Sequence, residues 1–417
     1  MPTTPRREPF CEQREPFGER PAPSRRSQRG LDWFTFFLAN VQTGFGPFVA
    51  VYLTTQAWTQ VDIGLVLTVG GLFSLAGQIP GGALVDAVRP EKRLAIGAVV
   101  VIGLTALAFA VWPTFPVILA AEVLHSLASC VLGPALVAIS LGLVGHKAIG
   151  ERLGRNARFS SMGNGLAAAA MGACGYLVSS RGVFVLTAVL LVPALIALAR
   201  IGDREIDPER AHGGPVTPKS DARVISLLHN RPLLILAACA LLFHLANAAM
   251  LPLMGGIVTM RSSHWATVLI AACIVAPQLL VALMSPWVGR QAQSRGRRPM
   301  LLLGFAVLPL RGALLAVVTD PYLLVAVQVL DGISAVVLGI LVPLVIADVT
   351  SGTGHFNLAQ GVVGSAVGIG ASLSTTIAGY TIDHFGATAA FLVLAALGAA
   401  GLALMATAMP ETRPKEE

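Results

Sequence analysis

The sequence VLHSLASCVLG (residues 123–133) returns in similar form as VLDGISAVVLG (residues 329–339), 206 positions later. Other landmarks keep nearly the same offset: Gln42 recurs as Asn247, Pro47 as Pro252, Gly163 as Gly368 and Gly175 as Gly379. Matches between apolar segments are common by chance, but polar and helix-breaking residues that keep one offset indicate an internal repeat. The chain is therefore predicted to contain two copies of one unit.

The composition is that of a membrane protein. Hydrophobic residues make up 55% of the chain and charged residues 12%, against about 25% charged residues in soluble domains. A bilayer crossing takes about 20 apolar residues. Apolar segments of that size are predicted at 31–55, 62–85, 93–112, 115–143, 157–179, 182–201, 232–259, 264–288, 299–318, 321–347, 360–382 and 386–409. The predicted fold class is an all-α membrane protein with twelve transmembrane helices.

The basic residues predict the orientation. With the N-terminus in the cytoplasm, 26 of the 29 Lys and Arg residues fall on cytoplasmic segments, as the positive-inside rule expects. The net charge of +7 is thereby explained by membrane topology, and no nucleic-acid partner is expected. We expect a multi-pass protein of the cell (inner) membrane with both termini in the cytoplasm.

The polar segments divide the chain into five parts. We predict a disordered cytoplasmic tail at 1–30, a six-helix bundle at 31–201, a cytoplasmic linker at 202–231, a second six-helix bundle at 232–409 and a cytoplasmic tail at 410–417. Because each bundle has an even number of helices, both copies enter the membrane in the same orientation and form parallel repeats.

Two loops carry a recognisable motif. GGALVDAVRPEKR (residues 81–93) contains Gly82 and Asp86 followed by the basic residues Arg89, Lys92 and Arg93, and SPWVGRQAQSRGRRP (residues 285–299) contains Gly289, Gly296, Arg297 and Arg298. With twelve helices in two halves, the chain resembles the major facilitator superfamily of secondary transporters, without an assigned subfamily. The second loop departs from the family pattern, since Gln293 stands where an acid is expected.

The resemblance implies a cytoplasmic gate that must open when the two halves rock. We assign it to Asp86 with Arg89, Arg93, Arg297 and Arg298, the acid forming an ion pair with the basic turn. The alternative is that the arginines only enforce topology. A second family feature is missing, because the arginine and glycine usual in helix 4 are replaced by Glu122 and Ser126. The coupling of related antiporters is therefore not expected.

Helices 1, 4, 7 and 10 line the central cavity in the family. Their polar residues here are Gln42, Glu122, His125, His244, Asn247, Gln328 and Asp331, which we predict as cavity or substrate residues. Ionisable groups in a membrane are costly, so Glu122, Asp331 and Arg311 in helix 9 are candidates for coupling. Two alternatives stay open: an Arg311–Asp331 ion pair that is purely structural, and interhelical hydrogen bonding for Gln42 and Asn247.

The leading functional hypothesis is a secondary active transporter that moves a small solute by alternating access, with proton coupling through Glu122 and His125. The alternative is a non-pumping receptor or partner-binding protein on the same fold. The acids favour a cationic substrate, whereas Arg311 could receive an anion.

The chain carries no HExxH, GxSxG or nucleotide-binding motif, so we expect no enzyme, cofactor or metal site. The expected partners are the solute, membrane lipid and protons, and the expected state is a monomer.

Overall fold

The computed structural model describes residues 22–43, 47–214, 227, 229–261 and 266–413. Within these ranges the elements are helices and no strand occurs. The N-terminal half contains α1 (Arg25–Thr43), α2 (Pro47–Thr55), α3 (Gln60–Ala87), α4 (Glu91–Val111), α5 (Phe115–Leu177) and α6 (Ser180–Ala199). The short η1 (Asp203–Glu205) and α7 (Pro208–Ala211) follow. The C-terminal half contains α9 (Arg231–Asn247), α10 (Met250–Arg261), α11 (Ala266–Arg295), α12 (Arg297–Val317), α13 (Pro321–Val349) and α14 (Phe356–Ala408).

Nine helices of the described chain are long and apolar enough to cross a membrane. Two of them, α5 with 63 residues and α14 with 53, far exceed the length of one crossing. Each consists of two helical segments joined at a single non-helical glycine, Gly145 (φ 68°) in α5 and Gly386 (φ 83°) in α14. Glycine adopts positive φ at little steric cost, so one residue suffices for the joint.

This joint corrects the predicted loop between residues 143 and 157. The basic residues Lys147, Arg152 and Arg155 lie on the second helical segment of α5, which starts directly after Gly145. The predicted start of the second span, at residue 157, was therefore wrong, because a loop was assumed where one glycine makes the turn. Arg152 is consequently buried, with only 5% of its surface exposed.

The beginning of the chain differs from the prediction as well. Helix α1 starts at Arg25, so residues 25–30, which were assigned to the disordered tail, are helical. The backbone N–H and the hydroxyl of Ser24 donate to the Glu205 carboxylate at 2.8 and 2.9 Å, and the Gly202 N–H donates to Ser27 Oγ at 2.9 Å. These bonds hold the start of α1 against the segment that follows α6. Residues 1–21 and 414–417 of the two predicted tails lie outside the described residues.

The seventh predicted span is interrupted near its proline. Helix α9 ends at Asn247 and α10 starts at Met250, two residues before Pro252. Proline lacks an N–H and is tolerated best in the first turn of a helix, which is where Pro252 lies. At this interruption, the Ala249 N–H donates to Ser374 Oγ on α14 at 3.0 Å. In the first predicted span, α1 ends at Thr43 and α2 starts at Pro47, and residues 44–46 lie outside the described residues.

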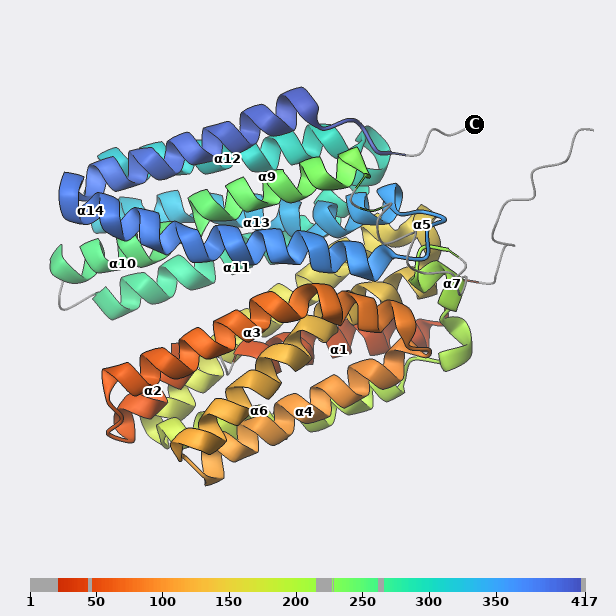
Figure 1. Cartoon of the computed structure of the whole chain (residues 1–417), viewed down its shortest axis with the longest axis horizontal. Helices are drawn as coiled ribbons and strands as arrows, with labels where there is room; N and C mark the ends of the chain where they lie inside the picture. The colour runs from red at the N-terminus through yellow and green to blue at the C-terminus, as the bar shows by residue number, and fades with distance from the viewer. Residues whose placement is uncertain (1–21, 44–46, 215–226, 228, 262–265, 414–417) are drawn as a thin grey trace, which may run out of the picture.

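The two halves pack against each other through α3 with α14 and through α5 with α11. Figure 1 shows the halves close together at the end where α7 lies and farther apart at the opposite end, which α2 and α10 mark. We call these the α7 end and the α2/α10 end. Buried apolar residues form two large clusters, one centred on each half.

Glycines allow the close contact between the halves. A Cβ atom on Gly361 of α14 would lie 2.4 Å from the backbone oxygen of Gln78 on α3. Similarly, a Cβ on Gly154 of α5 would lie 2.5 Å from the backbone oxygen of Ser285 on α11. Both distances are shorter than real Cβ contacts, and backbone atoms cannot rotate away. Only glycine permits this spacing of the helices.

Candidate functional site

A cavity of about 300 Å³ lies between the two halves, where α1 and α5 face α11 and α13. Its polar lining residues are Thr35, Asn156, Ser160, Ser161 and Gln278, and its remaining walls are Leu136, Val137, Leu153, Ala157, Val281, Ala335, Gly339 and Pro343. Among the residues that the structure describes, the lining includes hydroxyl and amide side chains but no charged one. Ligand pockets measure about 300 to 1,000 Å³, so this cavity suits a small molecule.

A buried charged cluster lies behind the cavity residue Asn156. Arg152 donates to Asp32 Oδ1 at 2.5 Å and to Asn156 Oδ1 at 2.9 Å. Arg155 donates two further bonds to the Asp32 carboxylate, at 2.8 and 2.5 Å. The Asn156 amide in turn donates to Ser140 Oγ at 2.8 Å. The cluster therefore ties α1 to both segments of α5 and fixes the orientation of one amide group in the cavity wall.

Neither the lining residues nor this charged cluster is among the residues predicted from the sequence. Serine and threonine are common in membrane helices, so their identity alone gives no signal. Arg152 and Asn156, four residues apart on one helical face, could have been found by helical periodicity. The assumed loop hid that pattern.

None of the seven predicted cavity residues lines this cavity. Glu122 is 8% exposed and packs against α3, where a Cβ on Gly70 would lie 2.6 Å from its Cγ. Among the described residues, neither Glu122 Oε2 nor Gln328 Oε1 has a hydrogen-bond partner. The assignment of these two residues to the transport pathway stays a prediction.

The other uncharged candidates make local contacts. His125 Nε2 lies 3.4 Å from Ser129 Oγ on the same helix, and His244 Nδ1 lies 2.9 Å from the Ala240 oxygen. Gln42 is half-buried near the end of α1. Their place in a transport pathway also stays a prediction.

Arg311 lies at the centre of a buried cluster within the C-terminal half. Its guanidinium donates to the Asp331 carboxylate and to Asn247 Oδ1, and it also contacts Met250 Sδ at 3.1 Å. The Arg311 side chain is 2% exposed and that of Asp331 is 26% exposed. The Arg311–Asp331 ion pair that the sequence left open is present in the structure. The side-chain oxygen of Asn247 accepts a hydrogen bond from the same arginine.

Asp86 connects the two halves, but not through the predicted ion pair with the basic turn. Its carboxylate accepts hydrogen bonds from the Leu358 N–H at 2.7 Å, the Asn357 N–H at 3.2 Å and the Asn357 side chain at 2.8 Å. These donors form the start of α14, and a negative charge is favourable at a helix N-terminus. Arg89 and Arg93, which were predicted to join it, are exposed.

The basic residues of the second motif bind within the C-terminal half. Arg297 is 4% exposed and pairs with Asp348 of α13 at 3.0 Å. The acidic partner of Arg297 is therefore Asp348 on α13, and not the residue at position 293, where the family pattern expects an acid. Gln293 instead donates to the Lys147 oxygen of the N-terminal half at 2.6 Å. Arg298 donates to the Ala406 oxygen at 2.5 Å.

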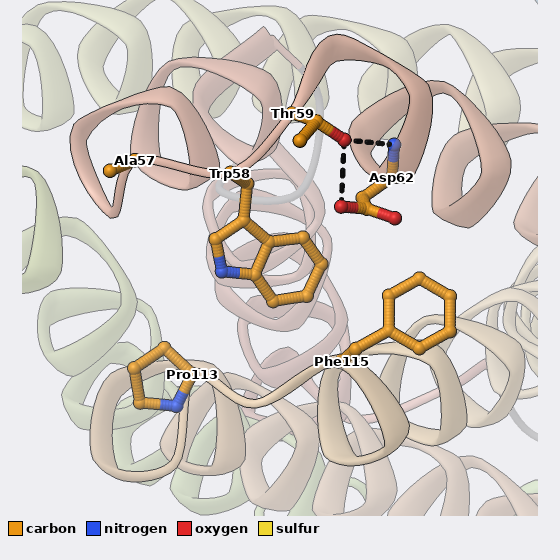
Figure 2. Close-up of a pocket in the computed structure, with 6 residues that line it drawn as sticks. All are labelled: Ala57, Trp58, Thr59, Asp62, Pro113 and Phe115. Atoms are coloured by element: carbon orange, nitrogen blue, oxygen red, sulfur yellow. Dashed lines mark hydrogen bonds between the residues drawn. The ribbon is translucent and has the colours of Figure 1, made fainter.

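A second cavity, of about 310 Å³, opens at the α2/α10 end of the N-terminal half. Figure 2 shows Trp58 and Phe115 facing its centre, and their rings stack at 5.8 Å. The Asp62 carboxylate in the cavity wall accepts a hydrogen bond from the Thr59 hydroxyl at 2.7 Å. The backbone N–H of Asp62 donates to the Thr59 hydroxyl oxygen at 3.1 Å. This reciprocal pair caps α3, so the polar groups of this cavity already form hydrogen bonds that stabilise the start of the helix.

In the part of the chain that the structure describes, no three His, Cys, Asp or Glu residues could hold a metal ion.

The fold and site define a multi-pass membrane protein with a small polar cavity between two helical halves. The family model described as Major Facilitator Superfamily matches residues 33–290 and 236–417. Two MFS-type transporters of Mycobacterium tuberculosis, from strains CDC 1551 and H37Rv and described as uncharacterized, are 41% identical over 392 residues, which cover 93% of this chain and 94% of theirs. The chain belongs to the Major Facilitator Superfamily of membrane transporters.

Solved structures share this fold at low sequence identity. The human organic anion transporter MFSD10 aligns with a TM-score of 0.70 at 14% identity, covering 92% of this chain and all of that one. The proton:xylose symporter XylE aligns at 0.71 and 13%, covering 93% of this chain and 96% of its own. The E. coli fucose:proton symporter FucP aligns at 0.73 and 14%, covering 91% and 97%. At these identities the likeness establishes the fold alone.

Proposed function

We propose that this protein is a secondary active transporter that moves a small, neutral, polar solute through the cavity between its halves. The observation that carries the proposal is the lining of that cavity, in which Thr35, Asn156, Ser160, Ser161 and Gln278 offer hydrogen bonds without a charged side chain. A charged solute would leave water without gaining a counter-charge there. The acids that favour a cationic substrate, Glu122 and Asp331, do not line this cavity.

The proposed topology has twelve spans, six in each half, with both termini in the cytoplasm. It is supported by the nine apolar helices, one of which joins α9 to the start of α10 and two of which, α5 and α14, contain two segments each, and by α1 with α2, which together would form the twelfth span. The basic residues of the chain then cluster toward the α7 end. In this topology the α7 end is cytoplasmic and is held closed by the glycine contacts and by Asp86.

Neutral sugars and polyols are the first solutes to test, because two of the similar structures are named as sugar:proton symporters. The purified protein in proteoliposomes is screened for counterflow against neutral, anionic and cationic solutes. We expect hits among the neutral polar solutes. Binding of a solute without any flux would favour a non-pumping receptor instead.

The cavity assignment is tested with Ser161→Ala and Gln278→Ala, each of which removes one hydrogen-bonding group from the wall. Each is expected to weaken the apparent affinity about 5- to 10-fold, since one net hydrogen bond contributes about 1 kcal/mol. Ser372→Ala is the matched control, because its exposed hydroxyl bonds only to Gly368 of its own helix. Equal affinities in all three variants would show that the solute binds elsewhere.

Proton coupling through Glu122 is part of the proposal. A charge inside a membrane is costly, and Glu122 Oε2 has no hydrogen-bond donor among the described residues, so a bound proton is the simplest means of neutralising it. Glu122→Gln should abolish proton-driven net uptake while solute exchange continues. Unchanged pH dependence in this variant would remove Glu122 from the coupling mechanism.

A further inference from the structure

The segment between the halves makes hydrogen bonds to both of them. We call residues 206–214 the linker strap, which Figure 1 shows as the region around α7 at one end of the molecule. On the N-terminal side, the Asp207 N–H donates to the Gly142 oxygen at 3.0 Å. On the C-terminal side, the Phe356 N–H donates to the His212 oxygen at 3.2 Å, and the Asn357 side chain donates to the Ala211 oxygen at 3.3 Å. The strap is thus part of the contact that holds the α7 end together.

His212 of the strap has no exposed surface, and both of its ring nitrogens face acceptors. Nδ1 lies 2.5 Å from the Pro208 oxygen and 3.3 Å from Glu91 Oε1, and Nε2 lies 3.1 Å from the Val85 oxygen. Carbonyl and carboxylate oxygens only accept hydrogen bonds, and a neutral imidazole has a single N–H. Only the doubly protonated ring can donate on both sides.

The surroundings supply the charge that an imidazolium needs. Glu91 of α4 is 1% exposed and lies against the ring, and Asp86 of α3 interacts with it electrostatically. On the strap itself, Arg210 is balanced by Asp207 at 3.6 Å. The residues of α5 and α14 that hydrogen-bond to the strap are Gly142, Phe356 and Asn357, and His146 of α5 interacts electrostatically with Arg210 of the strap. Two carboxylates therefore face the histidine.

We propose that His212 is a proton-binding site whose occupancy holds the linker strap between the halves and so keeps the α7 end closed. The proposal rests on alternating access as the function. When the proton leaves for cytoplasmic water, one ring nitrogen turns a lone pair toward a backbone oxygen, and the buried Glu91 loses its cation. Both changes weaken the strap. Asn357, which binds the strap and Asp86 at once, carries the change to the contact between α3 and α14.

The sign of the pH effect follows from linkage. A proton bound in the closed state and released on opening stabilises the closed state at low pH, and this stabilisation is lost as the pH rises. Opening of the α7 end should therefore increase as the cytoplasmic pH rises.

The experiment measures opening directly. Spin labels are attached to Glu151→Cys on α5 and Arg290→Cys on α11, both exposed positions, in full-length protein whose native cysteines are replaced by alanine. The distance distribution is recorded in nanodiscs between pH 5.5 and 8.5. We expect the short-distance population to fall at least 5-fold across this range in the parent protein. A parent protein without pH response would overturn the proposal.

Three variants locate the effect. His212→Gln should show little short-distance population at any pH, and Glu91→Gln should move the midpoint of the response to lower pH, because an opposite charge is removed. His384→Gln, an exposed histidine that lies outside the strap, should behave as the parent. An unchanged response in both His212→Gln and Glu91→Gln would overturn the proposal. If His212→Gln does not fold, Glu91→Gln alone decides.

The result can be separated from the proposed function. Flux of a neutral solute with a pH-independent distance would contradict the proton site and leave the transporter intact. A distance that follows pH through His212, without flux of any solute, would support the proton site and contradict the transporter.

Discussion

At the level of single residues, the buried pair of Arg311 and Asp331 separates structural from functional ionisable groups. Breaking a buried ion pair costs about 3 to 5 kcal/mol, because one charge is left without its partner. Asp331→Asn should therefore lower the melting temperature of the purified protein strongly. The double variant Arg311→Met with Asp331→Leu, which removes both charges, should recover most of the loss.

A transport role for Asp331 would give a different pattern. Asp331→Asn would then change solute affinity or pH dependence at an unchanged melting temperature. Ser372→Ala, with its exposed hydroxyl, serves as the control in both measurements.

Glu411 offers a test that depends on pH. Burial alone would raise the pKa of Glu411, but hydrogen bonds from the backbone N–H groups of Arg297, Arg413 and Arg298 outweigh it and hold the pKa below its ordinary value of 4.5. A lowered pKa means that the carboxylate stabilises the fold above about pH 4.5, and that this contribution is lost as the pH falls further. Glu411→Gln should thus be slightly less stable at pH 7, because water screens the interactions of this exposed carboxylate.

The difference should shrink once the wild-type carboxylate is itself protonated. Melting curves of wild type and Glu411→Gln at pH 7 and at pH 3.5 check this. Glu151→Gln, at an exposed position within α5, should match wild type at both values. An equal difference in melting temperature between wild type and Glu411→Gln at both pH values would show that the variant loses packing and not charge.

The residue scale also shows where sequence reasoning reached its limit. The cost of charge in a membrane correctly drew attention to Arg311 and Asp331, but charge does not tell which side of a helix faces a cavity. The cavity is lined by Ser160, Ser161 and Gln278, whose residue types occur widely in membrane helices. Their role follows from position between the halves, which a single sequence does not specify.

At the level of helices, the glycines between α3 and α14 set the spacing of the halves. Gly361→Ala would place a methyl group 2.4 Å from the Gln78 backbone oxygen, so the two helices must separate at this point. Overpacking of this kind costs about 1 to 3 kcal/mol, and it acts only in the state in which the helices touch. The α7 end should therefore open more often, which the labels at positions 151 and 290 would report.

The matched control is Gly379→Ala in the same helix, since nothing lies within 4 Å of its Cβ position. It should leave the distance distribution unchanged. Identical distributions for Gly361→Ala and wild type would show that the contact between α3 and α14 does not control opening.

Helix positions were predictable to different degrees. Apolar length identified the strongly hydrophobic helices α4, α6 and α12, whose predicted and observed spans agree within a few residues. The start of α1 was missed because Arg25, Arg26 and Arg29 gave that turn the composition of a tail. The first turns of the second segment of α5, residues 146–156, were missed because their basic residues gave them the composition of a loop. Polar helical turns at the ends of spans leave no hydropathy signal.

At the level of the whole molecule, the proposed orientation can be tested in cells. Thr114→Cys lies at the α2/α10 end and Glu151→Cys lies near the α7 end, both exposed. In a background without native cysteines, a membrane-impermeant maleimide should label Thr114→Cys in intact cells. It should label Glu151→Cys only after permeabilisation. The opposite pattern would invert the proposed topology.

The neutral lining of the central cavity has a consequence for selectivity. Hydroxyl and amide groups that are buried with a solute must find partners on it, and a missing partner leaves a desolvated group unpaired. A site of this kind discriminates sharply against analogues that lack a single hydroxyl, as well as against charged ones. Salt should barely affect recognition, whereas deoxygenation of the solute at one carbon should decide whether it is carried at all.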